Sequence, residues 1–179
     1  MEKTKILLSN ALLDLLQEKA FENIKVIEIC EKAMIHKTTF YNHFEDKYEL
    51  LNYSLLKMHK EIKEKAKKDE GIIEYYLSIA KCYIQYIKEN PKLFKSIISS
   101  GDNNIGLRLF HKLYVEDIEL KINKTKAYNI PSNYVANFYV DGVFSLISEW
   151  FVTGMKEDES TILLYIEKLI KGEIPFYKK

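Results

Sequence analysis

The chain has 179 residues, of which 47% are hydrophobic and 30% charged, a balance that excludes a disordered chain and allows a buried core. The formal net charge of +1 argues neither for nor against a nucleic-acid partner. No uncharged apolar run reaches membrane-spanning length, and polar residues interrupt the N-terminal run from residue 6 to 16, which excludes a signal-peptide core. We therefore expect a cytoplasmic protein without a membrane partner.

Apolar residues recur at helical spacing along the chain, whereas strand-like alternation is rare and there are only 6 glycines and 3 prolines. The pattern predicts an all-α protein of about nine helices. The first helix is expected at residues 4–19, where Leu8, Leu12, Leu15 and Leu16 form one apolar stripe for a three-helix head.

Two short helical patterns meet between residues 24 and 47. The first covers about residues 26–32, and the second covers about residues 36–44, with Phe40 and Phe44 one turn apart. The residues between them leave room only for a turn of three or four residues, which is the spacing of a helix-turn-helix.

The second of these helices leaves a distinctive set of side chains outside. They are hydrogen-bond donors and acceptors, with no carboxylate between Glu31 and Glu45. A surface that approaches phosphates must exclude carboxylates, and this one does. The set comprises His36, Lys37, Thr38, Thr39, Tyr41, Asn42 and His43.

The run Ile35-His36-Lys37-Thr38-Thr39-Phe40-Tyr41-Asn42-His43-Phe44, followed by Glu45-Asp46-Lys47, resembles the DNA-binding domain of the TetR family of transcriptional regulators. The resemblance covers about residues 4–56. Three positions depart from the family pattern: Met34 and Thr38 stand where glycine is usual, and Lys25 stands where Ser or Thr usually caps the second helix. Met34 predicts a turn without a positive φ, or a strained one.

The resemblance implies that the helix at residues 36–44 lies in the major groove of DNA. Lys37, Thr38 and Thr39 would be nearest the base edges. Tyr41 and His43 would donate to phosphates, and His36 and Asn42 complete the expected contact set. Lys47 is a phosphate contact by resemblance; a solvated surface lysine is the equally weighted alternative. The one arginine of the chain, Arg108, lies outside this head, which excludes base reading by a bidentate arginine there.

A fourth helix is expected at residues 47–67, with Asp46 and Glu49 as a capping box. The charged, glycine-ended run at residues 67–71 indicates a domain boundary. The predicted division is a DNA-binding domain at residues 1–47, a connector helix at 48–68, and a ligand-binding and dimerisation domain at 69–179. A connector that transmits ligand binding to the head is what the family implies.

Five further helices are expected in the C-terminal domain, at residues 72–89, 91–98, 105–122, 132–153 and 159–171. Asn90-Pro91 and Pro131 mark helix starts, Asp158 is the expected cap of the last helix, and residues 99–104 read as a loop.

The family implies a small-molecule effector pocket among the aromatic residues of these helices. Taken singly, a helical aromatic is more often core than ligand contact. An apolar and phenolic lining would favour a flat or lipophilic compound over a charged one. The expected lining is Tyr76, Tyr83, Tyr86, Phe94, Phe110, Tyr114 and Phe138.

The last two expected helices are apolar on more than one stripe, and Trp150 and Gly154 stand in the order W-x-x-x-G, as in the C-terminal helical pair of one TetR subfamily. The resemblance implies that this pair forms a four-helix bundle with its mate in a homodimer. A purely intramolecular core is the alternative. The expected interface residues are Gly142, Ser145, Ile147, Trp150, Phe151, Ile162, Ile166 and Leu169.

These patterns predict a DNA-binding transcriptional regulator, a dimeric repressor whose operator binding responds to a small molecule. Residues 1–50 carry seven lysines against nine acids, which favours the alternative of a TetR-fold coactivator or ligand sensor that acts through protein partners without binding DNA. An enzyme is the third class. No phosphate loop, HExxH or G-x-S-x-G motif supports it, and the four histidines and two cysteines lack metal-ligand spacing, so neither a cofactor nor a metal is expected.

Overall fold

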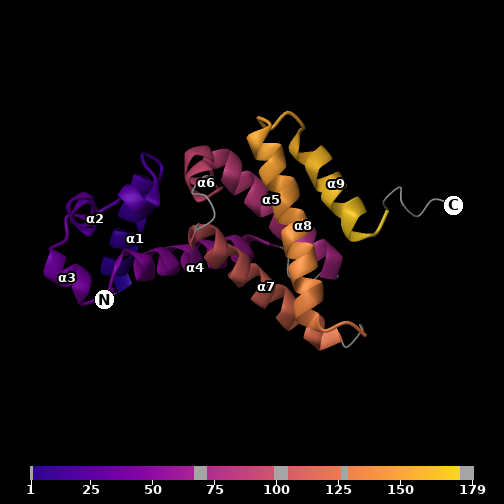
Figure 1. Cartoon of the computed structure of the whole chain (residues 1–179), viewed down its shortest axis with the longest axis horizontal. Coiled ribbons are helices and arrows are strands. Elements are labelled where there is room, and N and C mark those ends of the chain that lie inside the picture. The colour runs from indigo at the N-terminus through magenta and orange to yellow at the C-terminus, as the bar shows by residue number, and fades with distance from the viewer. Residues whose placement is uncertain (1, 67–71, 99–104, 126–128, 174–179) are drawn as a thin grey trace. The chain divides into compact units, whose positions relative to one another are not determined.

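The computed structural model describes residues 2–66, 72–98, 105–125 and 129–173, and at residues 72, 97, 105–107, 110, 124 and 125 only the backbone (Figure 1). Over these ranges all regular structure is helical, which confirms the expected all-α class. None of the described helices is long and apolar enough to cross a membrane. The elements are α1 (Glu2–Leu16), the 3-10 turn η1 (Phe21–Asn23), α2 (Val26–Ala33), α3 (Lys37–Tyr41), α4 (Lys47–Lys65), α5 (Ile72–Glu89), α6 (Pro91–Ile98), α7 (Ile105–Thr125), α8 (Ser132–Val152) and α9 (Glu159–Ile170).

The helix starts at residues 47, 72, 91, 105, 132 and 159 fall where the sequence predicts them. Helix α3, which the sequence predicts at 36–44, is regular only from Lys37 to Tyr41. Helix α1 begins and ends earlier than expected, α4 ends two residues earlier, and α7 ends three residues later. The loop expected at 99–104 lies outside the described residues.

The chain packs as two compact units, one of residues 1–60 and 87–110 and one of residues 61–86 and 111–179. Both units take residues from α4 and α5, so neither coincides with the predicted ranges 1–47, 48–68 and 69–179. Those ranges remain a proposal about how functions are divided along the chain.

The core of the first unit is built on α1, which packs against α2 and α6, while α2 packs against α3. The predicted stripe of Leu8, Leu12, Leu15 and Leu16 is buried. Fully burying a leucine contributes roughly 1.5–3 kcal/mol, so this stripe holds the head together far more strongly than helix propensity does.

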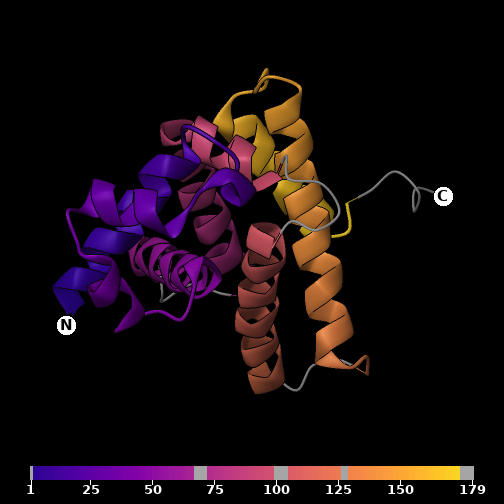
Figure 2. The same cartoon turned by 60° about the vertical axis from the view of Figure 1, so that its left-hand side comes forward.

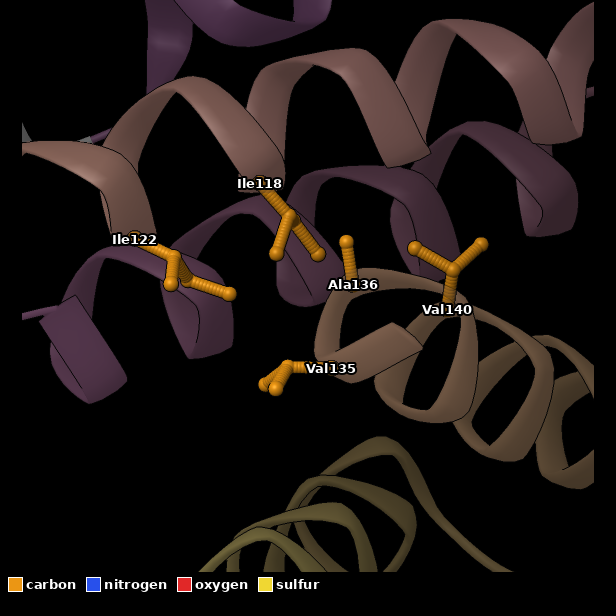
Figure 3. Close-up of a cluster of buried hydrophobic side chains, with 5 residues drawn as sticks. All are labelled: Ile118, Ile122, Val135, Ala136 and Val140. Carbon is orange, nitrogen blue, oxygen red and sulfur yellow. The ribbon is translucent and has the colours of Figure 1, made fainter. Parts of the chain in front are cut away.

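In the second unit α7 and α8 lie side by side (Figure 2) and share a buried apolar cluster. Ile118 and Ile122 of α7 point toward Val135, Ala136 and Val140 of α8 (Figure 3). Helix α9 packs along α8 (Figure 1), so α8 is covered on two sides, as its broad apolar circumference predicts.

Helix starts follow the predicted capping chemistry. The Asp46 carboxylate accepts hydrogen bonds of 2.8 Å from the backbone N–H groups of Tyr48 and Glu49. In a capping box the Glu49 carboxylate would accept from the N–H of Asp46. It accepts instead from the N–H of the preceding residue, Glu45, at 2.6 Å. At the start of α9 the Asp158 carboxylate accepts from the N–H of Thr161 at 2.8 Å.

The end of α2 resolves the two alternatives for Met34 in favour of the strained one. Met34 has φ 55° and ψ 43°, the left-handed conformation, and the next residue, Ile35, donates its N–H to the carbonyl of Cys30 at 2.9 Å. The same bond pattern ends α9, where Gly172 holds the left-handed position. The Met34 side chain is 92% exposed, so no burial offsets the strain.

Met34→Gly should raise the free energy of unfolding of the head by about 1 kcal/mol, because glycine adopts the left-handed region without a Cβ clash. Urea unfolding followed by circular dichroism measures this change. Glu31→Gly is the matched control: it places the same glycine at an exposed right-handed position of α2 and should destabilise by roughly 1 kcal/mol. Equal losses in both variants would contradict the strain at Met34.

Candidate nucleic-acid interface

Two buried phenylalanines set the orientation of α3. Phe40 is fully buried and Phe44 nearly so, with their ring centroids 5.9 Å apart, and Tyr53 of α4 packs on Phe44 at 5.5 Å. With that side of α3 turned inward, the polar side is turned out. His36, Lys37, Thr38, Tyr41 and Asn42 are exposed, and Thr39 and His43 are half-buried. The structure therefore leaves a polar surface without a carboxylate, and we call these seven residues the α3 face.

Two acidic residues of the head, Glu18 and Glu28, pair with its own lysines. Lys32 donates to Glu18 at 2.9 Å, and Lys19 donates to Glu28. These bonds hold the pKa of both carboxyls below their ordinary values. Glu18 and Lys19 lie in the segment after α1, and Glu28 and Lys32 lie on α2, so neither carboxylate is on α3.

Lys47 has a structural role that the sequence did not reveal. Its ammonium donates to the carbonyls of Phe21, Glu22 and Ile24 at 2.9, 3.0 and 2.9 Å, and it lies 4.7 Å from the centre of the Phe21 ring. An ammonium has three donors, and all three are used. Burial lowers the pKa of Lys47. The expected phosphate contact is thus replaced by a tie between the start of α4 and η1.

Lys5 of α1 is a cation near the α3 face that sequence reasoning missed. Its ammonium lies 5.6 Å from the ring centre of Phe44 and 5.7 Å from that of Tyr53. Phe44 directly follows His43, the last residue of the α3 face, in the chain, and its ring is buried. Nothing in the sequence distinguishes Lys5 from the other lysines, because only the fold brings α1 to this place.

The expected effector lining is only partly assembled. Tyr76 and Tyr114 pack on the same apolar cluster of α7 and α8, and the rings of Tyr83 and Tyr114 lie 4.9 Å apart. Tyr86 is half-buried in the same unit.

The remaining members of that lining do not join them. Phe138 is 74% exposed, and Phe94 belongs to the other compact unit, so neither is grouped with the four tyrosines. The side chain of Phe110 lies outside the described residues. Sequence reasoning also missed Asp117, which shares the helix face of Tyr114 three residues away and accepts a hydrogen bond from Tyr75.

The expected dimer residues divide into two groups. Ile147, Trp150, Ile162 and Ile166 are buried within one chain. Trp150 is 4% exposed and donates its indole N–H to the carbonyl of Glu157 at 2.9 Å. All four residues therefore have almost no surface left for a partner.

The second group remains accessible. Gly142, Ser145 and Leu169 are exposed and Phe151 is half-buried. They are accompanied by exposed apolar side chains that sequence reasoning did not assign to an interface, and together these exposed residues form what we call the α8–α9 face. The added members are Tyr134, Phe138, Val152, Leu164 and Tyr165.

Neither cysteine is bonded to another: Cys30 is buried and Cys82 half-buried, and burial raises the pKa of both thiols. Both therefore stay protonated near neutral pH. Among the residues that the structure describes, no group of three His, Cys, Asp or Glu side chains gathers to hold a metal ion.

Two family models match the chain. One, for the N-terminal domain of the bacterial regulatory proteins of the tetR family, matches residues 8–53, and one for a TetR-type transcriptional regulator C-terminal region matches residues 74–172. The Transposon Tn10 TetC protein of Escherichia coli is 28% identical over 139 residues, covering 75% of this chain and 70% of TetC.

Solved structures share the fold. A TetR-family transcriptional regulator from Syntrophomonas wolfei aligns with a TM-score of 0.71 at 21% identity, over 97% of this chain and 98% of that one. The dihydroxyacetone kinase operon activator DhaS aligns with a TM-score of 0.64 at 18% identity, over the whole of both chains.

The match of the helix-turn-helix head and of the helical body to these models defines a DNA-binding transcriptional regulator. With more than half of its length matched by the C-terminal model and the head matched separately, the chain belongs to the TetR family.

Lys47→Met should lower the free energy of unfolding by about 2 kcal/mol or more, because three carbonyls lose a charged donor while the apolar stem is kept. The matched control, Lys37→Met, removes an exposed lysine and should change stability by less than about 0.5 kcal/mol. Chemical unfolding of both variants measures the difference.

DNA binding as a function of salt separates the two roles further. Loss of one phosphate contact flattens the plot of log affinity against log salt by about 0.9, and we do not expect this change for Lys47→Met. If Lys47→Met flattened this salt dependence and left the free energy of unfolding unchanged, Lys47 would be a phosphate contact and not a structural tie.

Proposed function

We propose that this protein is a cytoplasmic, homodimeric repressor that binds an operator through the α3 face and leaves it when a small molecule binds the second unit. The observation that carries the proposal is the α3 face itself: seven polar residues turned outward by Phe40 and Phe44, with no carboxylate among them. Such a surface approaches a polyanion without like-charge repulsion.

The α3 face divides into base-reading and phosphate-binding residues. Lys37, with Thr38 and Thr39, would meet base edges in the major groove, the lysine at guanine acceptors and the threonine methyls at thymine methyls. Tyr41, with His36, Asn42 and His43, would donate to phosphates and fix the register, and Lys5 would add a phosphate contact from α1.

A dimer follows from the needs of the head and from the α8–α9 face. Two half-sites lie about 34–36 Å apart on DNA, one helical turn, which requires two heads. Exposed apolar side chains on neighbouring helices favour burial against a second copy. The small residues Gly142 and Ser145 would let the two α8 helices approach closely, while Phe138 and Leu169 would supply apolar area.

The competing function is a TetR-fold coactivator or ligand sensor that acts through protein partners without DNA. What favours it is the charge of the head, where Lys19, Lys32 and Lys47 are engaged internally. DhaS, which shares the fold, is named as an operon activator.

Selection of genomic fragments by the purified protein, followed by titration of the selected duplex at several salt concentrations, tests operator binding. Recovery of a palindromic site with salt-dependent affinity supports the proposal. A dimer that binds no DNA even at low salt would favour the coactivator.

Tyr41→Phe should weaken binding about fivefold on every sequence alike, since the lost hydroxyl serves a phosphate. Lys37→Met should instead change the sequence preference as well as the affinity. Binding to a library of single-base operator variants measures both. A loss confined to one base pair in Tyr41→Phe would contradict its phosphate role.

Gly142→Leu should weaken the dimer at least about tenfold, because overpacking a close interface costs roughly 1–3 kcal/mol. A Cβ built at Gly142 meets nothing within 4 Å in the single chain, so the protomer itself accepts the side chain. Sedimentation at graded concentrations measures the dissociation. Asn10→Leu, which adds the same side chain to an exposed position of α1, is the control, and unchanged mass in both would remove α8 from the interface.

A further inference from the structure

A largely buried carboxylate lies between three helices of the second unit. The side chain of Asp117, on α7, is 12% exposed. One of its oxygens accepts from the ammonium of Lys63 in the last turn of α4, and the other accepts from the hydroxyl of Tyr75 on α5 at 3.5 Å. Burying a carboxylate is costly unless a cation and hydrogen bonds accompany it, so Lys63 stabilises the site as it stands.

One hydrogen-bonding group beside Asp117 has no bond. The Tyr76 hydroxyl is buried and has no hydrogen-bond partner among the residues that the structure describes. Burial and the charge of Asp117 raise its pKa well above the ordinary value, and the same two causes, in that order, raise the pKa of Tyr75 to about 12. Both phenols therefore stay neutral at physiological pH, while Asp117 supplies negative charge.

The surroundings of this carboxylate are aromatic. The rings of Tyr75 and Tyr76 lie edge to face at 5.3 Å, and the ammonium of Lys121 already lies 3.1 Å from the centre of the Tyr75 ring. A carboxylate that accepts from one tyrosine of an aromatic pair offers an organic cation both a counter-charge and nearby rings. In this structure two lysines of the chain itself take these positions: Lys63 at the carboxylate and Lys121 over the Tyr75 ring.

We propose that Asp117, Tyr75 and Tyr76 form a binding site for an organic ammonium compound, which replaces the ammonium of Lys63 on the carboxylate and gives the Tyr76 hydroxyl its missing partner. The apolar body of the compound packs beside the cluster of α7 and α8 against which Tyr76 already lies. This inference rests on the proposed regulation by a small molecule and names the chemical class of that effector.

The exchange is favourable for electrostatic reasons. The Lys63 side chain is 32% exposed, so its ammonium reaches water with little rearrangement. One cation replaces another, and Asp117 is never left buried and unpaired. A neutral compound would leave the carboxylate without a cation, and an anion would add like charge. The sequence favoured a flat or lipophilic effector over a charged one, because it does not show that Asp117 lies near these tyrosines.

The site also has a route to regulation. Lys63 is two residues from the end of α4, and α4 is one continuous helix from Lys47, which ties its start to η1 in the head. Removing Lys63 from Asp117 releases the last turn of α4 from α7. An effector bound at Asp117 therefore changes how the helix that leaves the head is held.

Three probes of one shape test the site: 2-phenylethylammonium, the neutral 2-phenylethanol and the anionic phenylacetate, each titrated calorimetrically into the full chain. We expect the ammonium probe to bind at least about tenfold more tightly than either of the others, as a charged hydrogen bond requires. Lys63→Met should tighten its binding several-fold by removing the internal competitor, and Asp117→Asn should abolish the preference.

Two further variants guard against a structural explanation. Asp141→Asn removes another carboxylate of this unit, which pairs with His111 at 2.8 Å and is largely exposed, and it should keep the preference for the ammonium. Tyr76→Phe should weaken the ammonium probe while leaving the fold at least as stable, since it deletes an unbonded buried hydroxyl.

Equal binding of the three probes, a preference that survives Asp117→Asn, or no ammonium binding even in Lys63→Met would overturn the proposal. Operator binding is measured separately. DNA binding without a cation preference rejects the ammonium site alone, whereas a cation preference without DNA binding rejects the operator proposal alone.

Discussion

The burial of Phe40 and Phe44 is the constraint on which the head depends. Helix α3 has only five regular residues, too few to be stable alone, so its direction is set by what it packs against. Once the two rings are fixed against each other and against Tyr53, the helix can turn only its polar side outward. Apolar packing on one side of α3 thus holds the helix in place, and the polar residues on its other side remain exposed for contacts with a partner.

The lysines show how a single residue type takes opposite roles in one fold. Lys47 and Lys63 both lie on α4, and each is drawn to a group of the chain itself: three carbonyls for Lys47, and the carboxylate of Asp117 for Lys63. Lys37, on α3, is exposed, with no carboxylate on its helix. A count of charges gives a slightly acidic head, yet what a polyanion meets is set by which lysines the packing has already engaged.

The two last helices illustrate a related division of apolar residues. Helices α8 and α9 carry more apolar side chains than one stripe needs. Some of these side chains are buried within the chain, and others lie on the α8–α9 face. Trp150 and Ile166 are buried, whereas Phe138 and Leu169 are exposed. The exposed set is where we place the second copy, since an apolar surface on paired helices is stabilised by burial.

The sequence by itself determined the all-α class, most helix starts, and the identity of the α3 face. These follow from local rules: helical periodicity, capping carboxylates such as Asp46 and Asp158, and the spacing of Phe40 and Phe44. Only the tertiary structure decided that Lys47 ties η1 to α4, that Trp150 is internal, and that Asp117 lies with Lys63, Tyr75 and Tyr76. The physical reason is that the contacts of Lys47 and Asp117 join residues far apart in the chain, and helical periodicity carries no information about which other helix a given face will meet.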